Sequence, residues 1–134
     1  MSLKFENIKV YTSKLGALNK RAAITLPGIG IFVHPIDKDN IDLLRHEFGH
    51  ILQAKKWGIR FFILHIALQS LRSAQKANKN GFYNHMQNWT EWTANKLSYQ
   101  YFNCPDDWNF KQYPIFAEFE ASKIPQKLLH RLSF

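Results

Sequence analysis

The chain has 134 residues, of which 46% are hydrophobic, and it carries a net charge of +8. This length fits a single domain over residues 1–134, and so much apolar material excludes a disordered chain. A basic balance permits contact with nucleic acid or an anionic membrane, but no run of Lys and Arg is dense enough to predict a nucleic-acid partner.

The N-terminal part predicts β structure followed by a helix. The opening residues, MSLKFENIKVYTSK, contain no apolar core of the kind found in signal peptides, so we expect a cytoplasmic protein. Residues 21–35, RAAITLPGIGIFVHP, combine β-branched side chains with the turn dipeptide Pro27-Gly28. The segment DKDN then offers helix caps, and a helix is expected over residues 41–57, ended by Gly58.

Two further helices are expected downstream. The apolar run WGIRFFILHIAL, residues 57–68, is too short to cross a bilayer, which takes about 20 apolar residues. We expect it to be buried in a second helix that begins near Phe61 and ends at the NKNG break, residues 78–81. Peripheral contact of residues 57–68 with a membrane surface is the alternative. A third helix is expected from about residue 84 to residue 102.

The last part of the chain predicts little regular structure. Its cysteine, Cys104, is the single one in the sequence, so no internal disulfide can form and nothing indicates an oxidising compartment. Prolines interrupt this part, and a short helix is expected only near residues 116–122. The elements together predict an α+β fold, a small helix-dominated domain with a short β-hairpin or sheet before the first helix.

The helix over residues 41–57 contains the motif RHEFGHILQ. Its two histidines, His46 and His50, lie one turn apart on the same face, and Glu47 flanks them. Gly49 is a poor helix former, costing about 1 kcal/mol relative to Ala, which suggests that something approaches the backbone closely there. The opposite side is apolar and is expected to pack into the core: Leu44, Phe48, Ile51 and Leu52.

This spacing suits zinc chemistry. Two imidazoles one helical turn apart can both reach a tetrahedral ion, and Zn²⁺ lowers the pKa of a bound water to about 7. Glu47 is placed to take a proton from that water rather than to bind the metal. A helix that contains two histidines by chance is the alternative, but the pattern falls in the middle of a clearly predicted helix.

A third ligand is needed, and Glu91 in WTEWTANKLSYQYF is the leading candidate. The extended metzincin pattern fails, because Gln53 and Lys56 stand where it requires Gly and His. A glutamate on a helix rich in Trp and Tyr needs a cation or strong hydrogen bonds, and Asn95 lies one turn further on, suited to support a ligating histidine. On this helix Glu91 shares a polar face with Asn84, Gln87, Asn88, Asn95 and Ser98. The substitutes considered for Glu91 are His85, His65 and Glu118.

The motif His46-Glu47-x-x-His50 followed by Glu91-x-x-x-Asn95 resembles the gluzincin branch of the zincin metallopeptidases. The resemblance implies that His46, His50 and Glu91 bind Zn²⁺, that Glu47 is the general base, and that Asn95 supports a histidine. Larger gluzincins often carry an asparagine just before the ligand glutamate, where this chain has Thr90. The fuller strings HEFGHILQ and TEWTANKLSYQYF are also similar to small uncharacterised bacterial proteins predicted to be metallopeptidases.

We therefore expect a zinc-dependent metallopeptidase in which Glu47 activates a zinc-bound water for attack on a peptide bond. The strand over residues 29–34 is expected to offer an edge to an extended peptide. Candidate donors for the developing oxyanion are Tyr99, Tyr83, His34 and His85. The rival hypothesis is a non-catalytic zinc-binding module that contacts a protein partner or a membrane. A closed set of four protein ligands would favour that rival.

Overall fold

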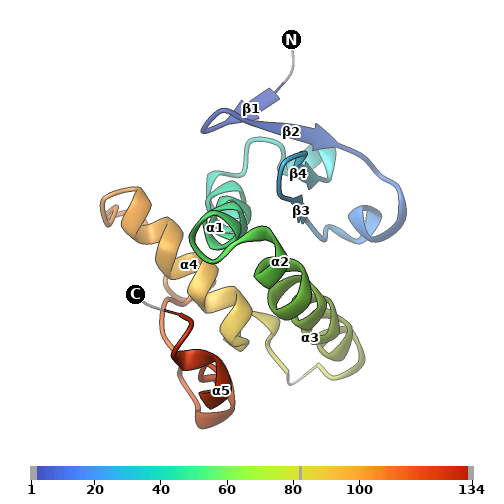
Figure 1. The fold of residues 1–134 in the computed structure, drawn as a ribbon. Helices are drawn as coiled ribbons and strands as arrows, with labels where there is room; N and C mark the ends of the chain where they lie inside the picture. The colour runs from blue at the N-terminus through green and yellow to red at the C-terminus, as the bar shows by residue number, and fades with distance from the viewer. Residues whose placement is uncertain (1–2, 82, 133–134) are drawn as a thin grey trace.

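A small sheet and a group of helices form the protein, seen in Figure 1 as a computed structural model that describes residues 3–81 and 83–132. The four strands are β1 (Leu3–Phe5), β2 (Ile8–Thr12), β3 (Ile24–Leu26) and β4 (Gly30–Val33), in the order β1-β2-β4-β3. β2 and β4 run parallel, and the other two pairs are antiparallel.

The predicted β structure in residues 21–35 is a hairpin of β3 and β4 around the Pro27-Gly28 turn, where Gly28 has φ +85°. Strands β1 and β2 were not predicted, because their short sequences mix Lys with apolar residues. The prediction that residues 29–34 offer a free edge is wrong, since β4 lies between β2 and β3. β3 is the outer strand on that side of the sheet.

Helix α1 (Ile41–Trp57) has the predicted bounds. The Asn40 side chain caps it by accepting a hydrogen bond from the Leu43 amide, 3.2 Å long, and the helix ends at Gly58, whose φ is +92°. α1 lies between the sheet and helix α4 (Trp89–Tyr101), as Figure 1 shows. The close approach expected at Gly49 is confirmed, because a Cβ atom there would lie 2.2 Å from the Ala94 carbonyl oxygen.

The second predicted helix is one continuous helical segment over residues 59–79, which we call the 59–79 helix. It comprises α2 (Ile59–Phe61), a stretch of π-helix (Phe62–Ala67) and α3 (Leu68–Lys79). One face of its first half is buried, as expected, but the other face is exposed. None of the helices in the described parts of the chain is both long enough and apolar enough to cross a membrane.

The third predicted helix is shorter than expected. Residues 84–88 are not part of the α-helix. His85–Gln87 form a 3-10 turn, and the Asn88 side chain caps α4 by accepting a 3.0 Å hydrogen bond from the Thr90 amide. Asn84 and Gln87 therefore do not share a helical face with Glu91. The remaining helical pieces are short: 3-10 turns at Gly16–Lys20, Pro35–Asp37 and Glu120–Ser122, and α5 (Gln126–Leu129).

Three apolar clusters stabilise this arrangement. Val10, Ile31, Val33 and Leu44 join the sheet to α1. A second cluster joins the 59–79 helix to α4 and the C-terminal segment: Phe61, Phe62, Ile66, Trp89, Trp92, Leu128 and Leu132. A third, smaller cluster contains Trp108, Tyr113 and Ile115. The predicted α+β, helix-dominated fold is confirmed, and α1 is its central element.

Candidate metal centre

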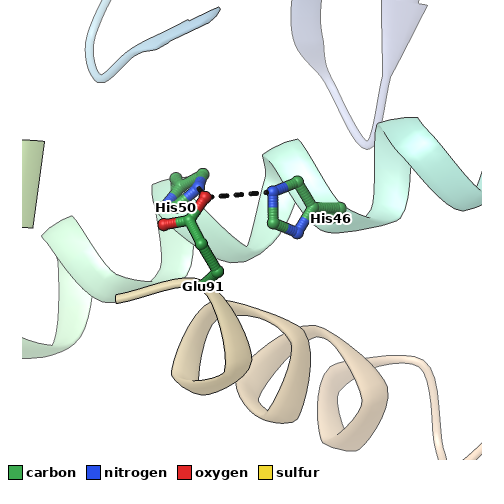
Figure 2. Close-up of side chains that lie close together, drawn as sticks. All are labelled: His46, His50 and Glu91. Carbon is green, nitrogen blue, oxygen red and sulfur yellow. Dashed lines mark ion pairs between the residues drawn. The ribbon is translucent and has the colours of Figure 1, made fainter. Parts of the chain in front are cut away.

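Helices α1 and α4 bring the side chains of His46, His50 and Glu91 together in the interior (Figure 2). The Nε2 atom of His50 lies 3.4 Å from Glu91 Oε1, and that of His46 lies 3.6 Å from the same oxygen. All three residues are buried, and one ligand atom from each lies within 4.8 Å of the others. The group could therefore hold a metal ion.

Asn95 fixes the orientation of the His46 ring. Its Oδ1 atom lies 2.6 Å from His46 Nδ1, and its Nδ2 atom donates to the carbonyl of Pro114 over 3.0 Å. Because that carbonyl can only accept, the amide oxygen must face the ring, and the ring proton lies on Nδ1. Nε2 of His46 is thereby the nitrogen that faces Glu91.

Gln53 does the same for His50. Its Oε1 atom lies 2.8 Å from His50 Nδ1, while its Nε2 atom donates to the Thr90 carbonyl at 2.7 Å and to the Thr93 hydroxyl at 2.8 Å. Both histidines thus turn Nε2, the ring nitrogen that contacts no amide, toward the same carboxylate oxygen. Partners of this kind on the far nitrogen are typical of metal-binding histidines.

Three electron-pair donors that face one point require a positive charge between them. Burial disfavours charge on His50 and on Glu91, but the attraction between them outweighs it. The pKa of His50 is raised to about 9 despite its burial, because the Glu91 carboxylate lies beside it. The imidazoles likewise hold the pKa of buried Glu91 well below its usual range. A proton supplies the charge in the metal-free protein, and a metal ion could replace it.

Two of the three separations between donors are those that a tetrahedral metal ion requires. Ligand atoms held at about 2.0–2.2 Å from a tetrahedral ion lie about 3.3–3.6 Å from one another. The two separations between imidazole nitrogen and carboxylate oxygen, 3.4 Å and 3.6 Å, fall in that range. The Thr90 hydroxyl lies 2.7 Å from the other oxygen of Glu91 and can donate to it. The carboxylate is thereby held with Oε1 toward the histidines.

Glu47 lies at the edge of this group. Its Oε1 atom is 3.9 Å from His46 Nε2, and its Oε2 atom accepts a 2.6 Å hydrogen bond from the Thr25 hydroxyl of β3. The residue is buried. Thr25 thus fixes one oxygen of Glu47 and leaves the other directed toward the histidines, where it could accept a proton.

His85 also reaches the group, from the turn before α4. Its Nε2 atom lies 2.9 Å from Glu91 Oε1, and its Nδ1 atom lies 2.8 Å from Ser73 Oγ, which in turn is 2.8 Å from the Tyr83 hydroxyl. The simplest arrangement of protons has Tyr83 donating to Ser73, Ser73 to His85, and His85 to Glu91. His85 is then a hydrogen-bond donor to the carboxylate rather than a fourth member of the metal group.

The other substitutes considered for Glu91 lie elsewhere. His65 sits on the π-helical stretch, with its ring 4.8 Å from that of Phe61. Glu118 accepts a hydrogen bond from the side chain of Gln87 at an exposed position. Neither belongs to the group formed by the histidines of α1.

Two of the candidate oxyanion donors are committed to other contacts. The His34 side chain caps the turn Pro35–Asp37, and the Tyr99 ring packs edge-on against Trp108. Tyr83 reaches Glu91 through Ser73 and His85. The sequence analysis missed Tyr113, whose ring lies 5.5 Å from that of His46. Burial raises the pKa of Tyr113 to about 12, so its hydroxyl keeps its proton.

Comparisons with protein-family models, with curated proteins and with solved structures gave no match. The fold and the site therefore define the class of protein by themselves. It is an α+β protein with a buried His-His-Glu group that could hold a metal ion, next to a second buried glutamate.

Proposed function

We propose that this protein is a zinc-dependent hydrolase of amide bonds, and most directly a peptidase of the gluzincin type. The observation that carries the proposal is the convergence of His46, His50 and Glu91 on one point, with Glu47 beside them. A structural role for the two glutamates alone would not require both imidazoles to turn their Nε2 atoms inward.

His46, His50 and Glu91 would hold the ion. Bound zinc would supply a Lewis acid and lower the pKa of a bound water to near 7. Glu47 is the group that would accept a proton, on the oxygen that Thr25 leaves free, and return it to the leaving amine. Asn95 and Gln53 each accept a hydrogen bond from Nδ1, so Nε2 is the nitrogen that each imidazole would offer to the ion.

The proposed substrate is an extended peptide. β3 is the outer strand of the sheet, and its Thr25 hydroxyl contacts Glu47, so the strand runs beside the site. A peptide that adds to an outer strand gains backbone hydrogen bonds and brings successive carbonyl groups past the site. Tyr113 carries a protonated hydroxyl and packs on His46, which makes it the leading donor to the developing oxyanion.

The contact between His85 and Glu91 favours a second candidate function. A small rotation of the His85 ring would add a fourth protein ligand, and a closed set of four is typical of structural zinc sites. The protein would then be a non-catalytic zinc-binding module. The two functions differ in whether Glu47 matters, because a structural site has no use for a general base.

The test combines metal analysis with peptide cleavage. We expect purified protein to contain about one zinc per chain, the pair His46→Ala and His50→Ala to contain none, and Glu91→Ala to bind zinc weakly. Glu47→Gln should keep its zinc but cleave a mixed peptide library about 10²–10⁴-fold more slowly, because an amide cannot accept the proton. Full zinc content in the double His variant would reject the site. Unchanged cleavage by Glu47→Gln would reject the mechanism.

A further inference from the structure

The outer face of the 59–79 helix carries an unbroken row of large apolar side chains. They recur at intervals of about one turn, which places them on one side of the helix. We call this row the leucine stripe: Ile59, Ile63, Leu64, Leu68 and Leu71, with exposed fractions of 47%, 51%, 62%, 46% and 59%.

The stripe is not needed for the core. The opposite face of the same helix carries Phe61, Phe62 and Ile66, which are buried in the apolar cluster with α4. The first half of the helix is therefore apolar on both sides, whereas a surface helix ordinarily has one polar face. In Figure 1, α2 and α3 (green) form one edge of the molecule, and the exposed fractions of the stripe show that its side chains reach the surface there.

The charged side chains of the helix that carries the stripe are of one sign. Residues 59–79 contain no Asp or Glu. The basic residues of this helix are all exposed: Arg60, Arg72, Lys76 and Lys79. An apolar stripe flanked by cations and free of acidic residues complements a bilayer with anionic headgroups. It does not suit a second copy of itself, because the two cationic rims would repel each other.

We propose that the leucine stripe docks on the surface of an anionic membrane. The 59–79 helix lies in the plane of the interface, with the stripe at the boundary between headgroups and acyl chains and Arg60 and Arg72 on anionic headgroups. The buried face of this helix contacts the site, since the Phe62 ring lies 6.1 Å from that of His50 and Ser73 contacts His85. Docking therefore holds the metal centre about one helix diameter, roughly 10 Å, from the bilayer.

The test is co-sedimentation of the full chain with vesicles of phosphatidylcholine alone or mixed with phosphatidylglycerol. We expect binding to the mixed vesicles at least about tenfold tighter than to the neutral ones. Replacing Leu64, Leu68 and Leu71 with Gln, which keeps helix propensity, should weaken that binding by about tenfold or more. The matched control replaces Leu15, Ile29 and Ile36 with Gln, at positions that are 81%, 57% and 71% exposed, and should change it less than about threefold.

A second pair of variants separates docking from simple attraction of a basic protein. Arg60→Gln with Arg72→Gln and Lys4→Gln with Lys9→Gln each lower the net charge from +8 to +6. The arginine pair should weaken binding about tenfold, and the lysine pair less than about threefold. Equal losses from both pairs, no binding to either vesicle, or self-association that the leucine variant abolishes would each overturn the proposal. The charge pairs decide the matter even if the leucine variant fails to fold.

Discussion

Asn95 and Gln53 show how single residues prepare this site. Each is a buried amide whose nitrogen donates to a backbone carbonyl, so its oxygen can only accept from a histidine Nδ1. The two amides come from different helices, Gln53 from α1 and Asn95 from α4. The imidazoles are therefore oriented before any ion binds, which lowers the entropic cost of binding it.

His85 is the residue whose role most needs a direct measurement. If it only donates a hydrogen bond to Glu91, His85→Ala should keep about one zinc per chain and raise the zinc Kd by about 10–100-fold, the usual effect of losing a partner of a metal ligand. Competition with a chromophoric chelator gives that Kd. His130→Ala, at an exposed position on the C-terminal side, is the control and should leave it unchanged. Zinc content well below one per chain in His85→Ala would make His85 a ligand.

A buried carboxylate at a distance from the site gives a pH-dependent prediction. Hydrogen bonds and charge from Arg21, at 2.5 Å to each oxygen, lower the pKa of Asp37 below its ordinary value of 3.8. A lowered folded-state pKa means that the pair stabilises the protein above about pH 4 and that this contribution is lost as the pH falls through the folded-state pKa. Asp37→Asn should unfold at a lower urea concentration than the parent at pH 7. The difference between the two urea midpoints should be smaller near pH 3.

The exposed carboxylate of Asp39 provides the control for that experiment. Asp39→Asn should match the parent protein at both pH values. The difference in urea midpoint between Asp37→Asn and the parent could instead stay constant down to pH 3. That result would show that the variant acts through packing rather than through the ion pair.

The sequence predicts individual site residues to different extents. His46, Glu47 and His50 follow from helical spacing alone, and Glu91 follows from the cost of burying a carboxylate without a cation. Gln53 lies one turn after His50, so the same spacing could have identified it as a partner. Thr25 and Tyr113 give no local signal, because only the tertiary fold brings a strand and an irregular segment to the histidine face of α1.

At the scale of elements, Gly49 sets the distance between α1 and α4. An Ala in a helix is ordinarily better than Gly by about 1 kcal/mol. Here the added methyl group would lie 2.2 Å from a backbone oxygen of α4, and a backbone cannot move aside without shifting the helix. Gly49→Ala should therefore lower the free energy of unfolding by about 1–3 kcal/mol in urea denaturation, and displace Glu91 enough to weaken zinc binding.

Gly81→Ala is the matched control, since a methyl group there has no neighbour within 4 Å. It should change the unfolding free energy by less than about 0.5 kcal/mol. A Gly49→Ala protein as stable as the parent would mean that the two helices separate freely, and that their spacing does not fix the metal group.

The start of α4 shows why element boundaries were harder to predict than element types. The polar residues 84–88 continue the helical pattern, but Asn88 accepts from the Thr90 amide and begins the helix there. Asn88 and Glu91 then stand at the cap and third helical positions, where a capping glutamate usually turns back to the backbone. Glu91 instead faces the histidines, as Figure 2 shows. The attraction between the Glu91 carboxylate and the two histidines outweighs the preference of a glutamate at this position for the backbone of the cap residue.

At the scale of the whole molecule, the site joins three layers. The sheet contributes Thr25, α1 contributes both histidines and Glu47, and α4 contributes Glu91 and Asn95. Hydrogen bonds join residues that are 22 and 49 positions apart in the sequence, Thr25 to Glu47 and His46 to Asn95. Any ion bound here is bound by the folded chain and not by a local peptide, so metal binding and folding are linked.

This linkage gives a prediction for metal removal. A ligand that binds only the folded state at a concentration about 100 times its Kd stabilises that state by about 2.7 kcal/mol. For a chain of this size, that corresponds to a fall of about 10 °C in the unfolding midpoint when a strong chelator strips the zinc. The metal-free protein should still unfold cooperatively, because the apolar clusters do not depend on the ion, and added zinc should restore the midpoint.

The double variant His46→Ala and His50→Ala is the control for this experiment, and its unfolding midpoint should respond to neither chelator nor zinc. If neither chelator nor zinc changes the unfolding midpoint of the parent protein, the His-His-Glu group holds no metal in the folded state.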